Sequence, residues 1–356
     1  MQKSVIVDGA GGYIGGHVVK RLAKAGYRVK AVDLPAIHLG HLAGDGVETA
    51  SFDITKPETL KPVLLGADAV VHCAAAFDLA LPYEVLERVN VHGTRNLIAA
   101  CQELNVRRLI HFSTSGVYGA AQYTPVDENH PYKPLDAYSR SKLETEKVVL
   151  AARNNLDITM FRPTGVYGPG GKYLAGVFFA MFCILAERKI RLPRFTGGPL
   201  QTWVHVADIA GAVEFALREE KTRGGVFNLA ETDIIDAGIF FSALSESFGI
   251  ENKGEVKLSP RLFSLLATMG WHMPKAVSAA PLSWIITKEW GKIVARYHLV
   301  PDLRPQFTRD FYPFLNGDHV YSCKAFCDLG FVHEHPSFKK SFPDVVKWYR
   351  DQRWIP

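Results

Sequence analysis

The chain has 356 residues, of which 47% are hydrophobic and 22% are charged. These proportions are typical of a soluble globular protein with one large or two modest domains, and they exclude a disordered chain, a collagen and a coiled coil. The formal net charge of +5 comes from 41 basic and 36 acidic residues without long basic blocks. Nucleic acid is therefore not expected as a partner.

The cysteines predict neither disulfide bonds nor a metal centre. There are five of them, without the spacing of a disulfide framework, and none forms a Cys-x-x-Cys pair suited to zinc. The first residues show no basic segment and apolar run of a signal peptide, and no apolar run reaches the roughly 18 residues of a spanning helix. We expect a cytoplasmic protein in a reducing compartment.

The first half of the chain alternates short β-branched runs with helical stretches, as parallel βαβ units do. The predicted strands are Val5–Val7, Arg28–Asp33, Ala69–His72, Arg108–Ser113, Asp157–Phe161 and Val226–Leu229, and the predicted helices are Ile14–Lys24, Pro82–Leu104 and Tyr138–Asn154. This order predicts an α/β protein with a doubly wound parallel-sheet Rossmann fold. We expect residues 1–170 to form the Rossmann domain, to which the chain returns at 201–232. Residues 171–200 and 233–356 are expected to form a smaller, mostly helical substrate lobe.

A glycine turn links the first predicted strand to the first predicted helix. Gly9, Gly12 and Gly15 stand at three-residue intervals there, so a dinucleotide pyrophosphate could approach the helix N-terminus without meeting a Cβ atom. Asp33 follows at the end of the second strand and could accept hydrogen bonds from both hydroxyls of an adenosine ribose. The combination favours NAD over NADP; the alternative is a solvated loop acid behind ordinary turn glycines.

Tyr138 and Lys142 are candidates for acid/base catalysis. They stand four residues apart on a predicted helix, so both side chains can reach one site. A free phenol titrates near about pH 10, but a nearby ammonium and a cationic nicotinamide ring would stabilise the phenolate. Tyr-x-x-x-Lys alone is common on surface helices. Here the run Ser113–Ser115 ends the preceding strand, at the carboxyl edge where ligands of a doubly wound sheet bind.

Together these segments resemble the extended branch of the short-chain dehydrogenase/reductases, over roughly residues 3–230. Further segments similar to that family are Asp53-Ile54, His72 to Ala75, Asn90 to Asn96, Arg162-Pro163 with Tyr167 to Pro169, and Val204 to Asp208. The resemblance implies Tyr138 as acid/base, Lys142 as its electrostatic partner and ribose anchor, and Thr114 as the third catalytic group, with Ser115 as the fallback.

The resemblance also implies NAD as the cofactor and a homodimer built through the helices Pro82–Leu104 and Tyr138–Asn154. The cofactor residues it implies are Gly9, Gly12, Tyr13, Ile14, Gly15, Asp33, Asp53, Ile54, His72, Cys73, Ala74, Tyr138, Lys142, Pro163 and Gly165. Backbone groups of 72–74 are expected to line the cofactor. Asp8 stands where relatives usually carry threonine and adds negative charge near the pyrophosphate. Asn90 is expected to open a helix and bond the adjacent backbone, with a direct catalytic role as the alternative.

The substrate side separates two branches of the family. Enzymes of sugar nucleotides usually place asparagine and arginine where this chain has Gly165 and Gln201, and losing these groups would weaken a diphosphate site. The resemblance therefore favours NAD-dependent oxidation of a secondary alcohol on a sterol-like substrate, including decarboxylating oxidation of a sterol 4-carboxylate. The alternatives are a nucleotide-sugar epimerase or dehydratase, and a cofactor-sensing protein without turnover.

Apolar segments in the second half could bind such a substrate. They are Tyr173–Ala186, Leu262–Trp271 and Ala276–Ile286. The first favours a buried helix, with a membrane-facing or substrate-facing helix as the alternative, and their aromatic residues could instead form the lobe's own core or a dimer face. A basic cluster of Arg188, Lys189, Arg191 and Arg194 could contact phospholipid headgroups or be an ordinary surface feature.

Overall fold

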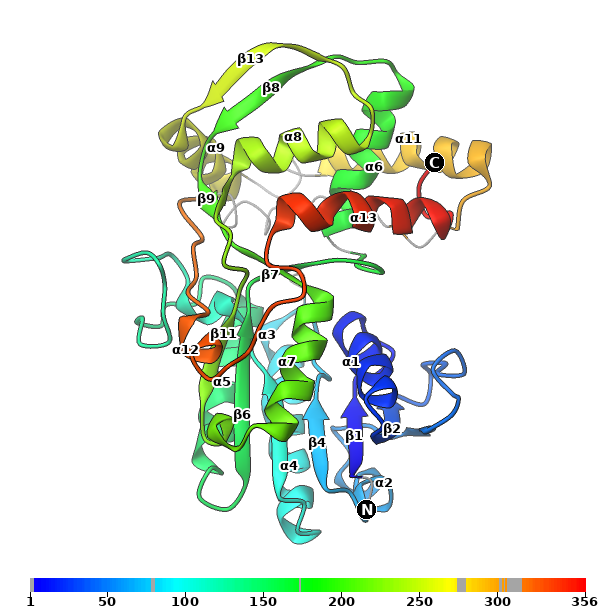
Figure 1. Ribbon diagram of the computed structural model, residues 1–356, viewed down its shortest axis with the longest axis vertical. Coiled ribbons are helices and arrows are strands. Elements are labelled where there is room, and N and C mark those ends of the chain that lie inside the picture. The colour runs from blue at the N-terminus through cyan, green and yellow to red at the C-terminus, as the bar shows by residue number, and fades with distance from the viewer. Residues whose placement is uncertain are drawn as a thin grey trace.

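The computed structural model describes residues 3–77, 81–172, 174–273, 280–300, 303, 305 and 316–356. At its centre lies a seven-stranded sheet in the order β11-β6-β5-β4-β1-β2-β3 (Figure 1), and its neighbouring strands are parallel. The strands are β1 (Ser4–Asp8), β2 (Arg28–Asp33), β3 (Val47–Ser51), β4 (Ala69–His72), β5 (Arg108–Phe112), β6 (Asp157–Pro163) and β11 (Val226–Leu229). The strand order reverses between β1 and β4, so the predicted Rossmann fold is confirmed.

The predicted strands coincide with six of these strands to within one or two residues, and only β3 was missed. The five residues of β3 are half-buried or exposed, and the strand lies at the edge of the sheet beside β2. An edge strand that buries little apolar surface carries no hydrophobic run in its sequence.

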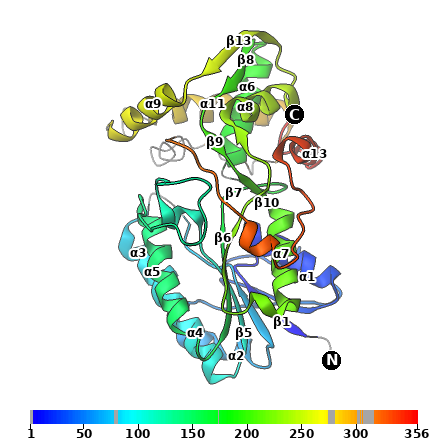
Figure 2. The same cartoon turned by 60° about the vertical axis from the view of Figure 1, so that its left-hand side comes forward.

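Helices cover both faces of the sheet (Figure 2). On one face, α1 (Tyr13–Lys24) packs against α7 (Val206–Arg218), and on the other α4 (Thr94–Glu103) packs against α5 (Ala137–Ala151). The predicted helix Pro82–Leu104 is not one regular helix. It consists of α3 (Tyr83–Leu86), the π-helical segment η2 (Glu87–Gly93) and α4. After α1 the chain turns at Gly26, whose φ of 85° confirms the left-handed backbone that glycine tolerates.

A second hydrophobic core lies outside the sheet, in the upper part of Figure 1. It is built from α6 (Leu174–Glu187), α8 (Ala237–Ser247), α11 (Ala280–Tyr297) and α13 (Phe338–Asp351), beside the parallel pair β8 (Leu192–Gly197) and β13 (Asn252–Leu258). Phe179 and Phe182 are buried within it, so the buried-helix interpretation holds for the described part of 173–186; Tyr173 lies outside the described residues, as do residues 276–279 of the third apolar segment.

The remaining described helices and strands lie in the connections around the sheet or in the second half of the chain. They are η1 (Pro57–Thr59), α2 (Lys61–Leu64), η3 (Ser115–Tyr118), β7 (Gly165–Tyr167), β9 (Leu200–Gln201), β10 (Trp203–His205), η4 (Glu220–Thr222), β12 (Ile235–Asp236), α9 (Pro260–His272) and α12 (Lys324–Cys327). Among the described helices, none has both the length and the apolar character needed to cross a bilayer. In the basic cluster, Arg188 pairs with Glu289 and Arg191 with Glu251.

A buried ion pair joins the sheet to α5. The Arg162 guanidinium in β6 donates two hydrogen bonds to the Glu146 carboxylate, at 2.9 and 2.6 Å, and both side chains are almost fully buried. The guanidinium also donates to the phenol oxygens of Tyr118 and Tyr132, at 2.8 and 2.9 Å. All these bonds depend on one cation, because no other donor in the network carries a charge to match the carboxylate.

We expect Arg162→Met to lower the free energy of unfolding by about 3–5 kcal/mol, because it leaves the buried Glu146 carboxylate without its hydrogen-bonded cation. Urea unfolding followed by circular dichroism measures the change. The control is Lys61→Met, which removes the exposed ion pair with Glu103 and should cost less than about 1 kcal/mol. Equal losses in the two variants would contradict the expectation.

Candidate active site

The glycine turn has the shape of a dinucleotide cradle. A Cβ atom on Gly9 would lie 2.7 Å from the Ala74 nitrogen, and one on Gly15 would lie 2.1 Å from the Gly9 oxygen, so neither position accepts a larger residue. Gly12 caps α1 without any side-chain hydrogen bond, and the first turn of the helix holds no acidic residue. The first N–H groups of α1, from Tyr13 and Ile14 onward, therefore suit an anionic pyrophosphate.

Acidic residues follow this turn along one edge of the sheet. The Asp33 carboxylate accepts hydrogen bonds from the backbone N–H groups of Gly11 and Leu34, at 2.9 and 2.8 Å, which holds it against the glycine turn. Asp53 lies beyond β3, where Thr55 donates to its carboxylate from both N–H and hydroxyl and lowers its pKa. The next residue, Ile54, is buried. The structure thus brings together the residues predicted to hold the adenosine ribose and to flank the adenine.

The Asp8 carboxylate, expected to add negative charge near the pyrophosphate, has hydrogen-bonding partners of its own within the protein. This fully buried carboxylate accepts hydrogen bonds from the backbone N–H groups of Cys73 and Ala74, at 2.7 and 2.8 Å, and contacts His72 Nδ1 at 2.7 Å. His72 Nε2 contacts the Thr94 hydroxyl at 2.9 Å. Asp8 therefore ties β1 to β4 and occupies the N–H groups of Cys73 and Ala74, so these two groups are not available to a cofactor.

The first turns of α5 carry the candidate catalytic pair. Asp136 caps the helix by accepting from the Ser139 N–H and hydroxyl, at 2.8 and 2.7 Å. Tyr138 is half-buried, with its ring edge-to-face against Phe77 at 4.8 Å. One turn later Lys142 is only 2% exposed, and burial lowers its pKa to about 8 although Glu146, Asp8 and Cys73 favour its charged form. The ammonium is therefore held largely out of water.

Thr114 lies at the end of the strand that precedes this helix. Its hydroxyl oxygen accepts a hydrogen bond from the Gly116 N–H at 3.1 Å, which leaves the hydroxyl proton to donate elsewhere. A Cβ atom on Gly116 would lie 2.5 Å from the Ser139 hydroxyl, so this segment packs directly against the first turn of α5. The Ser115 hydroxyl instead engages the Tyr321 phenol. Thr114 as the third catalytic group, with Ser115 as the fallback, stays a prediction.

Asn90 connects η2, the loop after β4 and α5. The sequence did not reveal this connection. Asn90 lies inside η2 and does not open a helix as expected. Its amide oxygen accepts from the Ala76 N–H at 2.7 Å, and its amide nitrogen donates to the Ser141 hydroxyl at 2.9 Å. Because Ser141 directly precedes Lys142, Asn90 fixes the loop after β4 relative to α5.

The wall opposite the sheet edge is aromatic. Pro163 ends β6 and is buried, whereas Gly165 in β7 is exposed. A Cβ atom on Gly165 would lie 2.9 Å from the Trp203 ring, and this indole stacks on Phe240 with ring centroids 5.3 Å apart. The Trp203 indole therefore fills the space beside Gly165. An asparagine side chain at position 165 would have to displace it.

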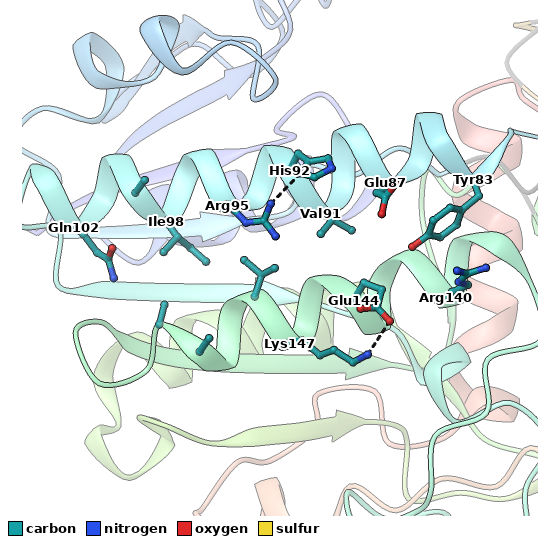
Figure 3. A pocket seen from close by; sticks show the side chains of 14 residues that line it. Tyr83, Glu87, Val91, His92, Arg95, Ile98, Gln102, Arg140, Glu144 and Lys147 are labelled. Atoms are coloured by element: carbon teal, nitrogen blue, oxygen red, sulfur yellow. Dashed lines mark hydrogen bonds and ion pairs between the residues drawn. The ribbon is translucent and has the colours of Figure 1, made fainter.

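A groove of about 860 Å³ lies elsewhere, between the helices predicted to form a dimer (Figure 3). One side comes from α3, η2 and α4 and the other from α5, and its apolar lining includes Val91, Ile98 and Val148. Charged side chains such as Arg95, Arg140 and Glu144 surround these apolar groups. The groove includes neither Tyr138 nor Lys142, and dimerisation through these helices stays a prediction.

The chain is similar to two kinds of characterised enzyme. It is 26% identical over 330 residues to the sterol-4-alpha-carboxylate 3-dehydrogenase, decarboxylating, of Mus musculus, covering 90% of this chain and 84% of that protein. It is 28% identical over 236 residues to the N-acetyl-alpha-D-glucosaminyl-diphospho-ditrans,octacis-undecaprenol 4-epimerase of Escherichia coli O157:H7, covering 65% of this chain and 68% of that protein.

Solved structures show the same fold. The dTDP-glucose 4,6-dehydratase DesIV of Streptomyces venezuelae, solved with NAD bound, superposes with a TM-score of 0.70 over 99% of this chain and 98% of its own, at 21% identity. The model of the family described as "NAD dependent epimerase/dehydratase family" matches residues 5–230, which is more than half of the chain. The chain therefore belongs to the NAD-dependent epimerase/dehydratase family, within the extended short-chain dehydrogenase/reductases, and is an NAD-dependent oxidoreductase.

Proposed function

We propose that the protein oxidises a secondary alcohol on a sterol-like substrate. The observation that carries this proposal is the indole of Trp203 beside Gly165. It puts an apolar ring at the position where sugar-nucleotide enzymes of the family usually hold the diphosphate with an amide. Gln201, a neutral side chain, stands where those enzymes place arginine. The named relatives among sterol dehydrogenases lend further support.

In this proposal the chain's own residues handle the proton and position the alcohol. Thr114 donates a hydrogen bond to the substrate oxygen, and Tyr138 removes the hydroxyl proton as the C–O bond gains double-bond character. Lys142 stabilises the phenolate by its charge. Bound NAD, held by the glycine turn and Asp33, supplies the hydride acceptor for the carbinol carbon.

A carboxylate on the neighbouring carbon would extend the reaction. Oxidation of the alcohol then produces a β-keto acid, which loses carbon dioxide as the carbon–carbon bond electrons move into the new ketone. No further residue is needed for that step beyond those that hold the ketone oxygen. We include this decarboxylating oxidation in the proposal because a sterol 4-carboxylate enzyme is among the relatives.

The second candidate function is epimerisation or dehydration of a nucleotide sugar, in which the reduced cofactor returns its hydride. The similarity to the undecaprenol-linked sugar epimerase favours it. The same Tyr138, Lys142 and Thr114 would serve both reactions, so only the substrate side separates them.

Tyr138→Phe should lower the rate of sterol oxidation by about 100- to 10,000-fold, because it removes the acid/base group, while NAD binding should persist. NADH absorbance with 3β-hydroxysterols and 4-carboxysterols, and product analysis with UDP-hexoses, measure the activity of the wild type and of the variant. The control is Tyr123→Phe, which alters an exposed tyrosine.

Wild-type turnover of UDP-hexoses, measured by product analysis, without any sterol oxidation would overturn the substrate proposal. Undiminished activity of Tyr138→Phe would overturn the catalytic assignment. Turnover of no substrate in the panel by a protein that binds NAD would favour the sensing protein.

The buried ammonium of Lys142 should also lower the free energy of unfolding of the cofactor-free protein, by an amount that depends on pH. Its pKa in the folded state is about 8, below the value of about 10.4 in an unfolded chain. The unfolded state therefore binds more protons between these pH values, and folding is penalised below about pH 8, with the penalty fading as pH rises toward about 10.4.

Lys142→Met should therefore raise the free energy of unfolding near neutral pH, by about 1–3 kcal/mol, while lowering activity. The gain should shrink as pH rises from about 8 to about 10. Urea unfolding at several pH values measures it, with the exposed Lys147→Met on the same helix as the control. A gain that grows with pH would contradict this assignment of the charge.

We further propose that α9 rests on a membrane surface, where an apolar sterol would be dissolved. Four side chains of its outer face are more than half exposed: Leu262 at 53%, Leu265 at 55%, Leu266 at 56% and Met269 at 55%. They recur at helical spacing on one side, and the helix extends outward from the second core (Figure 2). Its sequence holds Arg261 and His272 but no acidic residue, which suits anionic headgroups.

The double variant L265S/L266S should bind vesicles of phosphatidylcholine and phosphatidylserine at least about tenfold more weakly than the wild type, because each buried leucine contributes about 1.5–3 kcal/mol. Cosedimentation measures the bound fraction. The control is Leu65→Ser, an isolated leucine that is 70% exposed. If the wild type does not bind these vesicles, or if the double variant binds equally well, the membrane proposal is wrong. The apolar face of α9 then contacts something else, such as a second copy of this chain.

A further inference from the structure

Three side chains with metal-binding atoms meet in the segment that precedes α13. Cys323 caps α12, Cys327 is its last residue, and His333 lies in the loop that follows. The two Sγ atoms are 3.7 Å apart, and Cys323 Sγ lies 3.9 Å from His333 Nε2. All three ligand atoms lie within 4.8 Å of one another. None of these residues belongs to the catalytic or cofactor groups described above.

These separations fit a shared cation better than a disulfide bond. Zinc bonds of about 2.3 Å to sulfur and about 2.0–2.1 Å to nitrogen, at tetrahedral angles, place two sulfur atoms about 3.8 Å apart and sulfur and nitrogen about 3.6 Å apart. A disulfide needs Cβ atoms about 3.5–4.5 Å apart, whereas side chains four apart on a helix have Cβ atoms separated by about 5–6 Å.

The cluster is held in place by buried neighbours. Phe326, between the two cysteines, is fully buried, and its ring lies 4.9 Å from that of Phe331. Phe331 in turn packs edge-to-face against the His333 ring at 5.1 Å. This aromatic layer fixes α12 relative to the loop that carries the histidine.

Backbone hydrogen bonds fix the loop on its other side. The Asp208 carboxylate in α7 accepts from the N–H groups of Glu334 and His335, at 2.6 and 3.2 Å. Cys323 and His333 both lie within hydrogen-bonding range of the Ala230 backbone, which directly follows β11. Such contacts to a histidine ligand and its backbone are what orients a metal site.

We propose that Cys323, Cys327 and His333 bind Zn²⁺ or another thiophilic divalent cation. Two thiolates and one imidazole are the ligand types this class of ion prefers. Both thiols lose their protons to solvent when the ion binds. Cys327 and His333 are half-buried, so water can fill the fourth position. The ion would lock the segment entering α13 onto β11 and α7, a structural role that does not depend on the proposed substrate.

The test uses the full-length protein, prepared under reducing conditions and stripped with a chelator. Zinc titration with a competing chromophoric chelator measures affinity and stoichiometry, and Co²⁺ serves as a spectroscopic probe because thiolate ligands give it charge-transfer absorption. The variants are Cys327→Ser and His333→Gln. The controls are Cys183→Ala, a cysteine outside the cluster, and His41→Gln, whose side chain lies in an exposed loop.

We expect one ion per chain, thiolate-to-cobalt absorption, and affinity at least about tenfold weaker in both ligand variants but not in the controls. Thermal unfolding of the wild type, and not of the variants, should shift upward with zinc. Absence of stoichiometric binding, or binding that both ligand variants retain, would overturn the proposal. So would a mass lower by two hydrogens with fewer than five titratable thiols in protein purified without a reductant and then unfolded, because it would show a disulfide instead.

Discussion

The proposed active site depends on an ammonium group kept away from water. Lys142 is 2% exposed, and burial alone disfavours its charge. Two buried carboxylates act in the opposite direction: Glu146, one turn further along α5, and Asp8, at the end of β1. Each of them also has its own partner, Arg162 for Glu146 and His72 for Asp8. The charge of Lys142 is thus stabilised by a network that spans β1, β4, β6 and α5.

Much of the fold could be predicted from the sequence because buried parallel strands and amphipathic helices repeat with different periods. Asp33, Tyr138 and Lys142 could be placed for the same reason, since each lies at the end of a strand or on a regular helix. Side-chain partners across the sheet could not. The replacement of threonine by Asp8 gave no sign in the sequence that two N–H groups after β4 would receive the carboxylate. Asn90 was misplaced because a helical period does not reveal a π-helical segment.

The second half of the chain was harder to predict because its strands are short and its helices largely apolar. β8 and β13 pair outside the main sheet, and β13 is exposed along nearly its whole length. Similarly, Cys323 and Cys327 do not form the Cys-x-x-Cys pair that indicates a zinc site in a sequence. Their spacing of four residues becomes a shared face only if the segment is helical. His333 then joins them only because the chain turns at residues 328–330, where Gly330 has a φ of 103°.

Segment 318–337 connects the two hydrophobic cores, and its contacts therefore hold one core relative to the other. It pairs with β9 at one end, through the backbone of His319 and Leu200, and it places Tyr321 against Tyr118 and the Ser115 hydroxyl, beside the proposed catalytic residue Thr114. It then packs Phe326 into the core of the sheet domain and leads into α13 of the second core. A substrate bound between the aromatic wall at Trp203 and the edge of the sheet would need both sides held at a fixed separation. The interactions along this segment, including the cysteine and histidine cluster, are therefore the means by which the C-terminal chain can set that separation.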